Sequence, residues 1–131
     1  MKPLTDEWVR KAEGDYTSAG REFRARKDPN FDSACFHAQQ CVEKYLKARL
    51  HEADIAFKKT HNLVHLLDLI LPVEPLWESM RTSLVVLGNY AVGFRYPGES
   101  ADRKAARDAL KICTQIREQV RASLGCKDAK S

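Results

Sequence analysis

The spacing of apolar side chains constrains the fold of this chain more than any other feature of its sequence. Apolar residues recur at steps of three and four, the period of one helical face, over residues 6–25, 32–53 and 74–94 and again after Ser100. The stripe of the second segment is the clearest and consists of Phe31, Ala34, Ala38, Cys41, Tyr45 and Ala48. No segment alternates between apolar and polar residues as a half-buried strand does. The sequence therefore predicts an all-α protein.

Capping and helix-breaking residues set the expected helix boundaries. Thr5 is predicted to cap the first long helix and Ser100 the last, because their hydroxyls can accept hydrogen bonds from the free N–H groups of a first turn. Gly125 is predicted to end the last helix. A shorter helix is expected to start after Thr60 and to end before Pro72, whose ring cannot continue it.

Four long amphipathic helices with short connections favour an antiparallel up-and-down four-helix bundle. The one additional short helix is expected on the connection between the helices at 32–53 and 74–94. A chain of 131 residues is long enough to bury its own core, so one domain is expected. That domain has its core over about residues 5–125 and a polar tail at 126–131.

Composition narrows the class of protein. Hydrophobic residues make up 44% and charged residues 31% of the chain, a globular balance, and the net charge of +4 permits a phosphate-bearing partner without requiring one. No apolar run approaches the roughly 18 residues that span a bilayer. The four cysteines form no zinc-site spacing and no signal peptide precedes them. A cytoplasmic protein with reduced thiols and no membrane segment is expected.

Sequence motifs of the common enzyme classes are missing. The chain has no phosphate-binding Walker loop, no GxGxxG, no HExxH and no GxSxG. No glutamate stands three residues before a histidine, as di-iron bundles require. We therefore expect no metal and no cofactor.

Two groups of basic side chains are candidates for binding. On the second helix, a polar stripe opposite the apolar one includes Lys44 and Lys47; it is either a solvated face or a phosphate-contacting surface. His61 and His65 stand four residues apart. They are either a cap-proximal and a partly exposed histidine, or a ligand or acid–base pair.

The end of the fourth helix offers a third candidate. Arg95 can bind phosphate through two parallel hydrogen bonds, and Tyr96 can stack on a base, beside the stiff turn that Pro97 and Gly98 form. Alternatively, Arg95 satisfies the last helical carbonyls and Tyr96 packs on the end of the bundle.

Three stretches together resemble the HEPN family. They are FHAQQCVEKYLKARL at 36–50, KKTHNLVHLLDLI at 58–70 and NYAVGFRYPGES at 89–100. The resemblance implies an up-and-down four-helix bundle, usually a homodimer, often encoded beside a small nucleotidyltransferase as a toxin–antitoxin-like pair. It also suggests nucleotide binding, because the family resembles the helical domain of some antibiotic nucleotidyltransferases.

Many HEPN proteins are metal-independent ribonucleases with an arginine followed by a histidine, in which histidine moves a proton and arginine stabilises charge on phosphorus. After Arg95, the positions for that histidine hold Ser100, Ala101 and Asp102, so the motif is absent. The first hypothesis is therefore a non-catalytic, dimeric interaction module that docks a nucleotidyltransferase. The alternatives are a nucleotide- or RNA-binding module, or a ribonuclease with an altered site. The candidate nucleotide- or partner-binding residues are Arg95, Tyr96, Lys44, Lys47, His61 and His65.

Overall fold

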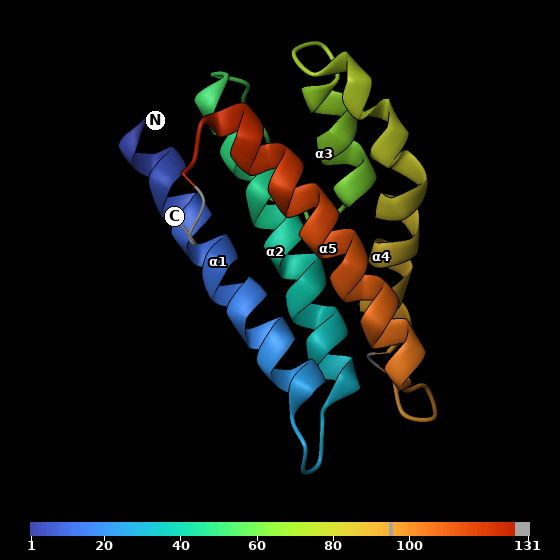
Figure 1. The fold of residues 1–131 in the computed structure, drawn as a ribbon. Coiled ribbons are helices and arrows are strands. Elements are labelled where there is room, and N and C mark those ends of the chain that lie inside the picture. Colours follow the sequence, from blue (N-terminus) through green and yellow to red (C-terminus); the bar gives the residue numbers. More distant parts are fainter. Residues whose placement is uncertain (95, 128–131) are drawn as a thin grey trace.

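The protein is a bundle of helices that run alternately up and down (Figure 1). A computed structural model describes residues 1–94 and 96–127, and no strand occurs among them. The elements are α1 (Pro3–Arg24), α2 (Phe31–Glu52), α3 (Leu63–Ile70), the 3₁₀-helix η1 (Pro75–Met80), α4 (Arg81–Gly93) and α5 (Arg103–Leu124). The expected all-α fold and antiparallel bundle are confirmed.

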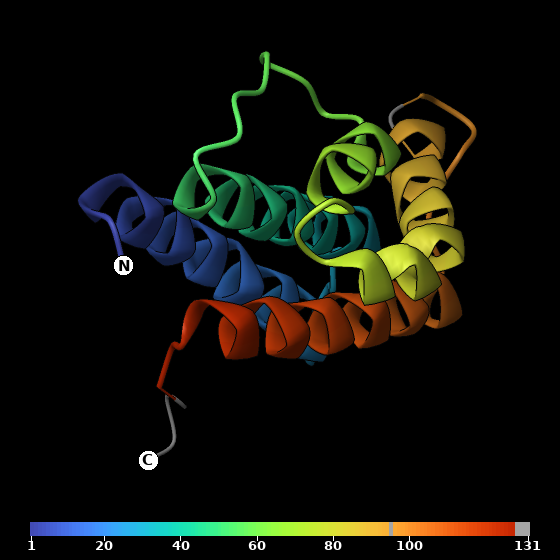
Figure 2. The ribbon, with the colours of Figure 1, turned by 90° about the horizontal axis from the view of Figure 1, so that it is seen from above.

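Helix α2 is the centre of the molecule. It packs against α1, α3, α4 and α5, whereas α1 and α4 lie on opposite sides of it (Figure 2). The predicted stripe accounts for part of this packing, since Ala34, Ala38, Cys41, Tyr45 and Ala48 are all buried. Leucines on the other sides of α2 are buried as well, each contributing about 1.5–3 kcal/mol of burial free energy. A helix with neighbours around most of its circumference leaves little surface to solvent.

Both predicted N-caps are wrong. Helix α1 begins at Pro3 with Lys2 as its N-cap residue, so Thr5 is a buried residue inside the helix. Proline suits this first position because it needs no N–H donor there. In α5 the side chain of Asp102, not that of Ser100, accepts a hydrogen bond from the N–H of Ala105 at 2.8 Å. The predicted terminator Gly125 is confirmed, with the left-handed φ of 73° that favours glycine.

The predicted fourth helix consists of two elements. Pro75 opens the tighter helix η1, and only after Met80 does the chain adopt the α-helical geometry of α4. Short 3₁₀ turns are common at helix N-termini. Trp77 and Met80 are buried, whereas Val73 is 41% exposed because it precedes both elements. The short helix α3 starts at Leu63 and ends before Pro72, close to its expected bounds.

Two special features are absent from the part of the chain that the structure describes. None of its helices is long and apolar enough to cross a membrane. No three side chains of His, Cys, Asp or Glu gather there in a way that could hold a metal ion.

Candidate functional site

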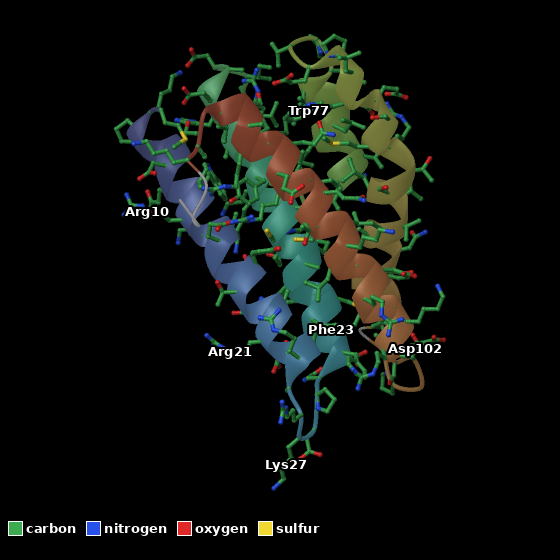
Figure 3. The ribbon with its side chains drawn as sticks, in the orientation of Figure 1. Arg10, Arg21, Phe23, Lys27, Trp77 and Asp102 are labelled. Atoms are coloured by element: carbon green, nitrogen blue, oxygen red, sulfur yellow. The ribbon has the colours of Figure 1, made fainter. Side chains whose placement is uncertain are left out.

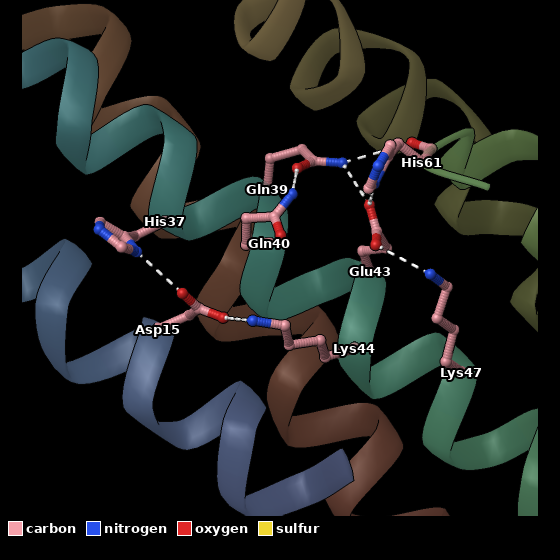
Figure 4. Close-up of polar contacts among 8 residues, drawn as sticks. All are labelled: Asp15, His37, Gln39, Gln40, Glu43, Lys44, Lys47 and His61. Carbon is pink, nitrogen blue, oxygen red and sulfur yellow. Dashed lines mark hydrogen bonds and ion pairs between the residues drawn. The ribbon is translucent and has the colours of Figure 1, made fainter. Parts of the chain in front are cut away.

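Two of the sequence blocks that resemble the HEPN family meet in a hydrogen-bonded network between α2 and the segment before α3 (Figure 4). Its centre is Glu43, which is only 3% exposed. The Glu43 carboxylate accepts hydrogen bonds from Lys47 Nζ at 3.0 Å and from Gln39 Nε2 at 3.3 Å, and it contacts His61 Nδ1 at 2.9 Å. Gln40 extends the network by donating to Gln39 Oε1 at 2.8 Å. We call this set the Glu43 network.

The Glu43 network compensates the burial of its charges. An ionised carboxylate inside a protein is costly unless it is paired and hydrogen-bonded, and here both oxygens have a partner. Lys47 is itself only 6% exposed, and its ammonium group lies 5.6 Å from the centre of a Trp8 ring. Lys47 therefore neutralises Glu43 within the fold instead of facing solvent.

His61 is the member of this network that reaches the surface. Because a carboxylate only accepts hydrogen bonds, the hydrogen in this contact belongs to His61 Nδ1. The His61 side chain is 76% exposed, and no hydrogen bond from a described residue reaches its Nε2. A buried carboxylate thus fixes the orientation of an imidazole whose second nitrogen remains accessible, an arrangement that suits hydrogen bonding or proton transfer.

A second cluster joins α2 to α1. Asp15, on α1 and nearly buried, contacts His37 Nδ1 at 2.8 Å through Oδ1 and accepts from Lys44 Nζ at 2.5 Å through Oδ2 (Figure 4). A solvated face, one of the two alternatives for this stripe, is not what the structure shows, because Lys44 and Lys47 point at two different carboxylates. Neither ammonium group is an unpaired cation.

A hollow of about 470 Å³ opens beside His61, between the start of α3 and α4. Its polar groups are His61, Asn62 and Asn89. The other lining residues are Leu63, Val64, Leu84, Val85 and Gly88. The hollow therefore offers an apolar floor with a few polar groups, the usual chemistry of a small-molecule pocket.

The remaining candidates do not gather at this hollow. His61 lies directly before Asn62, the N-cap residue of α3, which agrees with the cap-proximal alternative, and His65 is exposed on α3. Tyr96 is 65% exposed after the end of α4 and is not packed on the end of the bundle. Arg95 lies outside the described residues.

The positions where a ribonuclease motif would have its histidine help to fix the connection into α5. The N–H of Ala101 donates to Asp32 Oδ1 on α2 at 2.6 Å, and Asp102 caps α5. The first of these contacts joins the segment before α5 to the first turn of α2.

Sequence reasoning missed Asp15 and Glu43 as site residues. Asp15 interrupts an apolar stripe of α1, and an acid at such a position indicates a buried cationic partner. Glu43 stands four residues before Lys47, the spacing of a helical ion pair. Both signals were present in the sequence.

The fold and this arrangement of motif residues define a small helical-bundle domain built around a central helix that carries buried polar residues. The profile of the HEPN domain matches residues 5–123, and the chain therefore belongs to the HEPN family. It is similar to the protein TT1696 from Thermus thermophilus, with 25% sequence identity and a TM-score of 0.78 over 92% of this chain and 98% of that one.

A second solved structure has the same fold. It is ST0689, an archaeal HEPN homologue, which matches 94% of this chain and 98% of its own with a TM-score of 0.71 and 22% identity. No curated protein matches the chain significantly.

Proposed function

We propose that this HEPN protein is a non-catalytic interaction module: a homodimer that docks a small nucleotidyltransferase, the two proteins forming a toxin–antitoxin-like pair. The observation that carries the proposal is the uncharged outer face of α4. From residue 82 to residue 94 the chain has no charged side chain, although charged residues make up 31% of the protein.

Helix α4 lies at the edge of the bundle, where an exposed helical face is normally charged (Figure 2). Among the residues of α4 whose burial is described, the exposed positions are Thr82, Val85 and Asn89, spaced by three and four residues, and Val85 is 45% exposed. The half-buried Gly88 between them would place an added Cβ in open space, so packing within the chain does not require glycine there. A depletion of charge is typical of the centre of a protein interface. A second copy of the chain, bringing the same uncharged face, would bury it without leaving a charge unpaired.

The absence of the ribonuclease histidine supports a non-catalytic role. A positioned acid–base group contributes typically about 10²–10⁴-fold in rate, so its loss removes much of the activity of a ribonuclease. Two of the three residues at those positions have structural contacts instead: Ala101 contacts α2 and Asp102 caps α5.

The mass of the protein in solution tests the dimer. We expect the mass of two chains from light scattering, and we expect Val85→Arg to shift it toward one chain because a guanidinium would be buried at the interface. Thr17→Arg adds the same charge to an exposed site on α1, opposite α4, and should leave the dimer intact. A wild-type protein that remains monomeric at all concentrations contradicts the proposal.

Co-expression tests the partner. A nucleotidyltransferase encoded beside this protein should co-purify with it, and the complex should survive gel filtration. A neighbouring gene of another class, or a nucleotidyltransferase that elutes separately, would remove this half of the proposal while leaving the dimer.

The hollow beside His61 favours nucleotide binding as a second candidate function. Asn62 and Asn89 offer amide donors and acceptors above an apolar floor, which suits a planar base. Calorimetry with ATP, GTP and short RNA at low salt would detect binding, and Asn89→Ala should weaken it. If the wild type and the Asn89→Ala variant bound the ligand equally well, the binding site would lie outside this hollow.

A ribonuclease with an altered site is the weaker alternative, because it needs His61 or His65 to act with Arg95. Incubation with cellular RNA in EDTA compares the wild type with Arg95→Ala. Identical RNA profiles would exclude this activity.

A further inference from the structure

A groove runs between α1 and α5 on a side of the molecule that neither the Glu43 network nor α4 uses. It has a volume of about 390 Å³ and lies between antiparallel helices, with α1 descending and α5 ascending in Figure 1. Its lining consists of Tyr16, Thr17, Gly20, Phe23, Arg24, Leu110 and Thr114. We call it the α1/α5 groove.

Positive charge surrounds this groove. Arg24 lines it from α1, where its guanidinium lies so close to Gly20 that an added Cβ there would be 2.8 Å from Arg24 Nη1. Arg107 stands one turn before Leu110 on α5 and Lys111 directly after it, and both are exposed. None of these three cations forms an ion pair with a carboxylate among the described residues.

The charge continues along both helices. Arg103, one turn before Arg107, lies with its guanidinium 5.0 Å from the centre of the Phe31 ring, which packs against Phe23. Arg21, also exposed in the last turns of α1, points away from the bundle, on the other side of the helix from Phe23 (Figure 3). Four cations thus flank one groove: Arg24, Arg103, Arg107 and Lys111.

The floor of the groove is apolar. Phe23 and Leu110 are partly buried side chains that pack on the core from α1 and α5. Glycine at position 20 leaves room on α1 for the guanidinium of Arg24, which covers it. A ligand that matches the whole groove therefore carries both negative charge and apolar groups.

From this combination we propose that the α1/α5 groove binds an acidic, amphipathic protein segment, whose carboxylates pair with the flanking cations and whose apolar side chains contact Phe23 and Leu110. Docking of an amphipathic helix into an apolar groove is a common mode of peptide recognition. The site is separate from the proposed α4 dimer interface and does not depend on it.

The aromatic rings of the groove favour a peptide over single-stranded nucleic acid. Sequence-tolerant binding of single strands needs ring faces on which bases stack. In this groove the guanidinium of Arg117 already covers Tyr16, at 4.4 Å from the centre of its ring, and Phe23 is packed against Phe31. The cations of the groove suit either ligand, but Tyr16 already has a guanidinium over its ring and Phe23 an aromatic neighbour, which leaves less ring surface for stacked bases.

Fluorescence anisotropy with defined probes tests the proposal. The first probe is a labelled peptide of about 14 residues, roughly 21 Å long as a helix, with glutamates and with leucines at helical spacing. The second replaces its leucines by serine, and the third is an oligouridylate of equal charge. We expect the leucine peptide to bind the full-length protein at least about tenfold more tightly than the serine peptide and the oligouridylate.

Matched charge-reversal variants locate the binding. Arg24→Glu with Arg107→Glu should weaken binding of the leucine peptide by about tenfold or more, because both close cationic partners become repulsive. Lys58→Glu with Lys59→Glu changes net charge equally on the loop between α2 and α3 and should have little effect. Circular dichroism confirms that each variant is folded.

Three outcomes overturn the proposal: no binding of the leucine peptide at low salt, equal or tighter binding of the oligouridylate, or equal losses in the two double variants. Each leaves the dimer measured by light scattering unaffected, so failure of this inference and failure of the proposed function are distinguishable.

Discussion

His61 Nδ1 lies 2.9 Å from Glu43 Oε1, a contact that ties the segment before α3 to the middle of α2. Lys47 occupies the other oxygen of the same carboxylate, and Gln39 donates both to Glu43 and, more weakly, to the backbone carbonyl of His61. One buried acid therefore holds a lysine, a glutamine and a histidine in fixed positions. Two of the three family blocks of sequence meet at this single junction.

Removal of the Glu43 carboxylate should destabilise the protein strongly. Glu43→Ala leaves the ammonium of Lys47 buried without its counter-ion, which typically costs about 3–5 kcal/mol. Replacement of both residues, by Leu at 43 and Met at 47, removes the two charges together and should cost much less. Urea unfolding followed by circular dichroism measures the difference. Equal losses in the single and double variants would show that charge burial is not the cause.

His61→Ala should have a much smaller effect on global stability than Glu43→Ala. Most of the His61 side chain is exposed and Lys47 continues to neutralise Glu43, so a loss of no more than about 1 kcal/mol is expected. The local effect should be larger, because the contact anchors the chain before α3. Hydrogen exchange of the backbone at residues 53–62 should be faster in this variant, while exchange in α5 remains as in the wild type. Uniformly faster exchange would contradict a local anchoring role.

The fold could be predicted because burial in a bundle follows helical periodicity. Ala38, Cys41 and Tyr45 lie on the predicted stripe of α2 and are fully buried. Helix ends were less predictable, since several residues near each end can cap it. Asp102 and Ser100 are both good caps, and only the path of the chain decides between them.

The site was harder to predict because α2 has neighbours on most sides. A polar stripe opposite an apolar one normally faces solvent. In this bundle Lys44 faces α1, where its ammonium group donates a hydrogen bond to the carboxylate of Asp15. Periodicity shows which residues share a face but not which element covers that face. Pairing the polar residues required knowing that α1 and the segment before α3 lie on either side of α2.

The protein should lose stability in acid through Glu13. Burial alone would raise the pKa of Glu13, but hydrogen bonds from Arg117 and Tyr45 outweigh it and lower the pKa below the ordinary value of 4.5. A carboxyl group with a lowered pKa stabilises the folded state above its unfolded pKa, and that stability disappears as the pH falls through the folded value. The temperature of thermal unfolding should therefore decrease when the pH is lowered below about 4.5.

Glu13→Gln should reduce this acid dependence as well as the stability at pH 7, because Arg117 loses its bidentate partner. Glu118→Gln removes an exposed carboxylate of α5 and serves as the control. If the two variants showed the same pH profile, the Glu13 carboxylate would not be the group responsible.

Thiol reactivity should follow burial. Burial raises the pKa of Cys35 to about 12, and Cys41 and Cys113 are fully buried between α2 and α5. The pKa of Cys126 is raised as well, chiefly by burial, but its side chain is partly accessible after the end of α5. Because alkylation needs an accessible thiolate, iodoacetamide at pH 8 should modify Cys126 first. Peptide mapping by mass spectrometry identifies the site, and early modification of Cys35 would contradict the expected order.

The N-cap of α5 stands at one of the positions where a ribonuclease motif would have its histidine, so substitutions there test whether this position stabilises the helix. Asp102→Ala removes the acceptor for the N–H of Ala105 and a negative charge beside the positive end of the helix. A loss of about 1 kcal/mol in unfolding free energy is expected. Ser100→Ala removes a hydroxyl that does not cap the helix, so the unfolding free energy should decrease by no more than about a few tenths of a kcal/mol. Equal losses in urea unfolding would mean that Ser100 shares the capping role. A loss confined to Asp102→Ala would show that this position stabilises α5, the role that its contacts indicate.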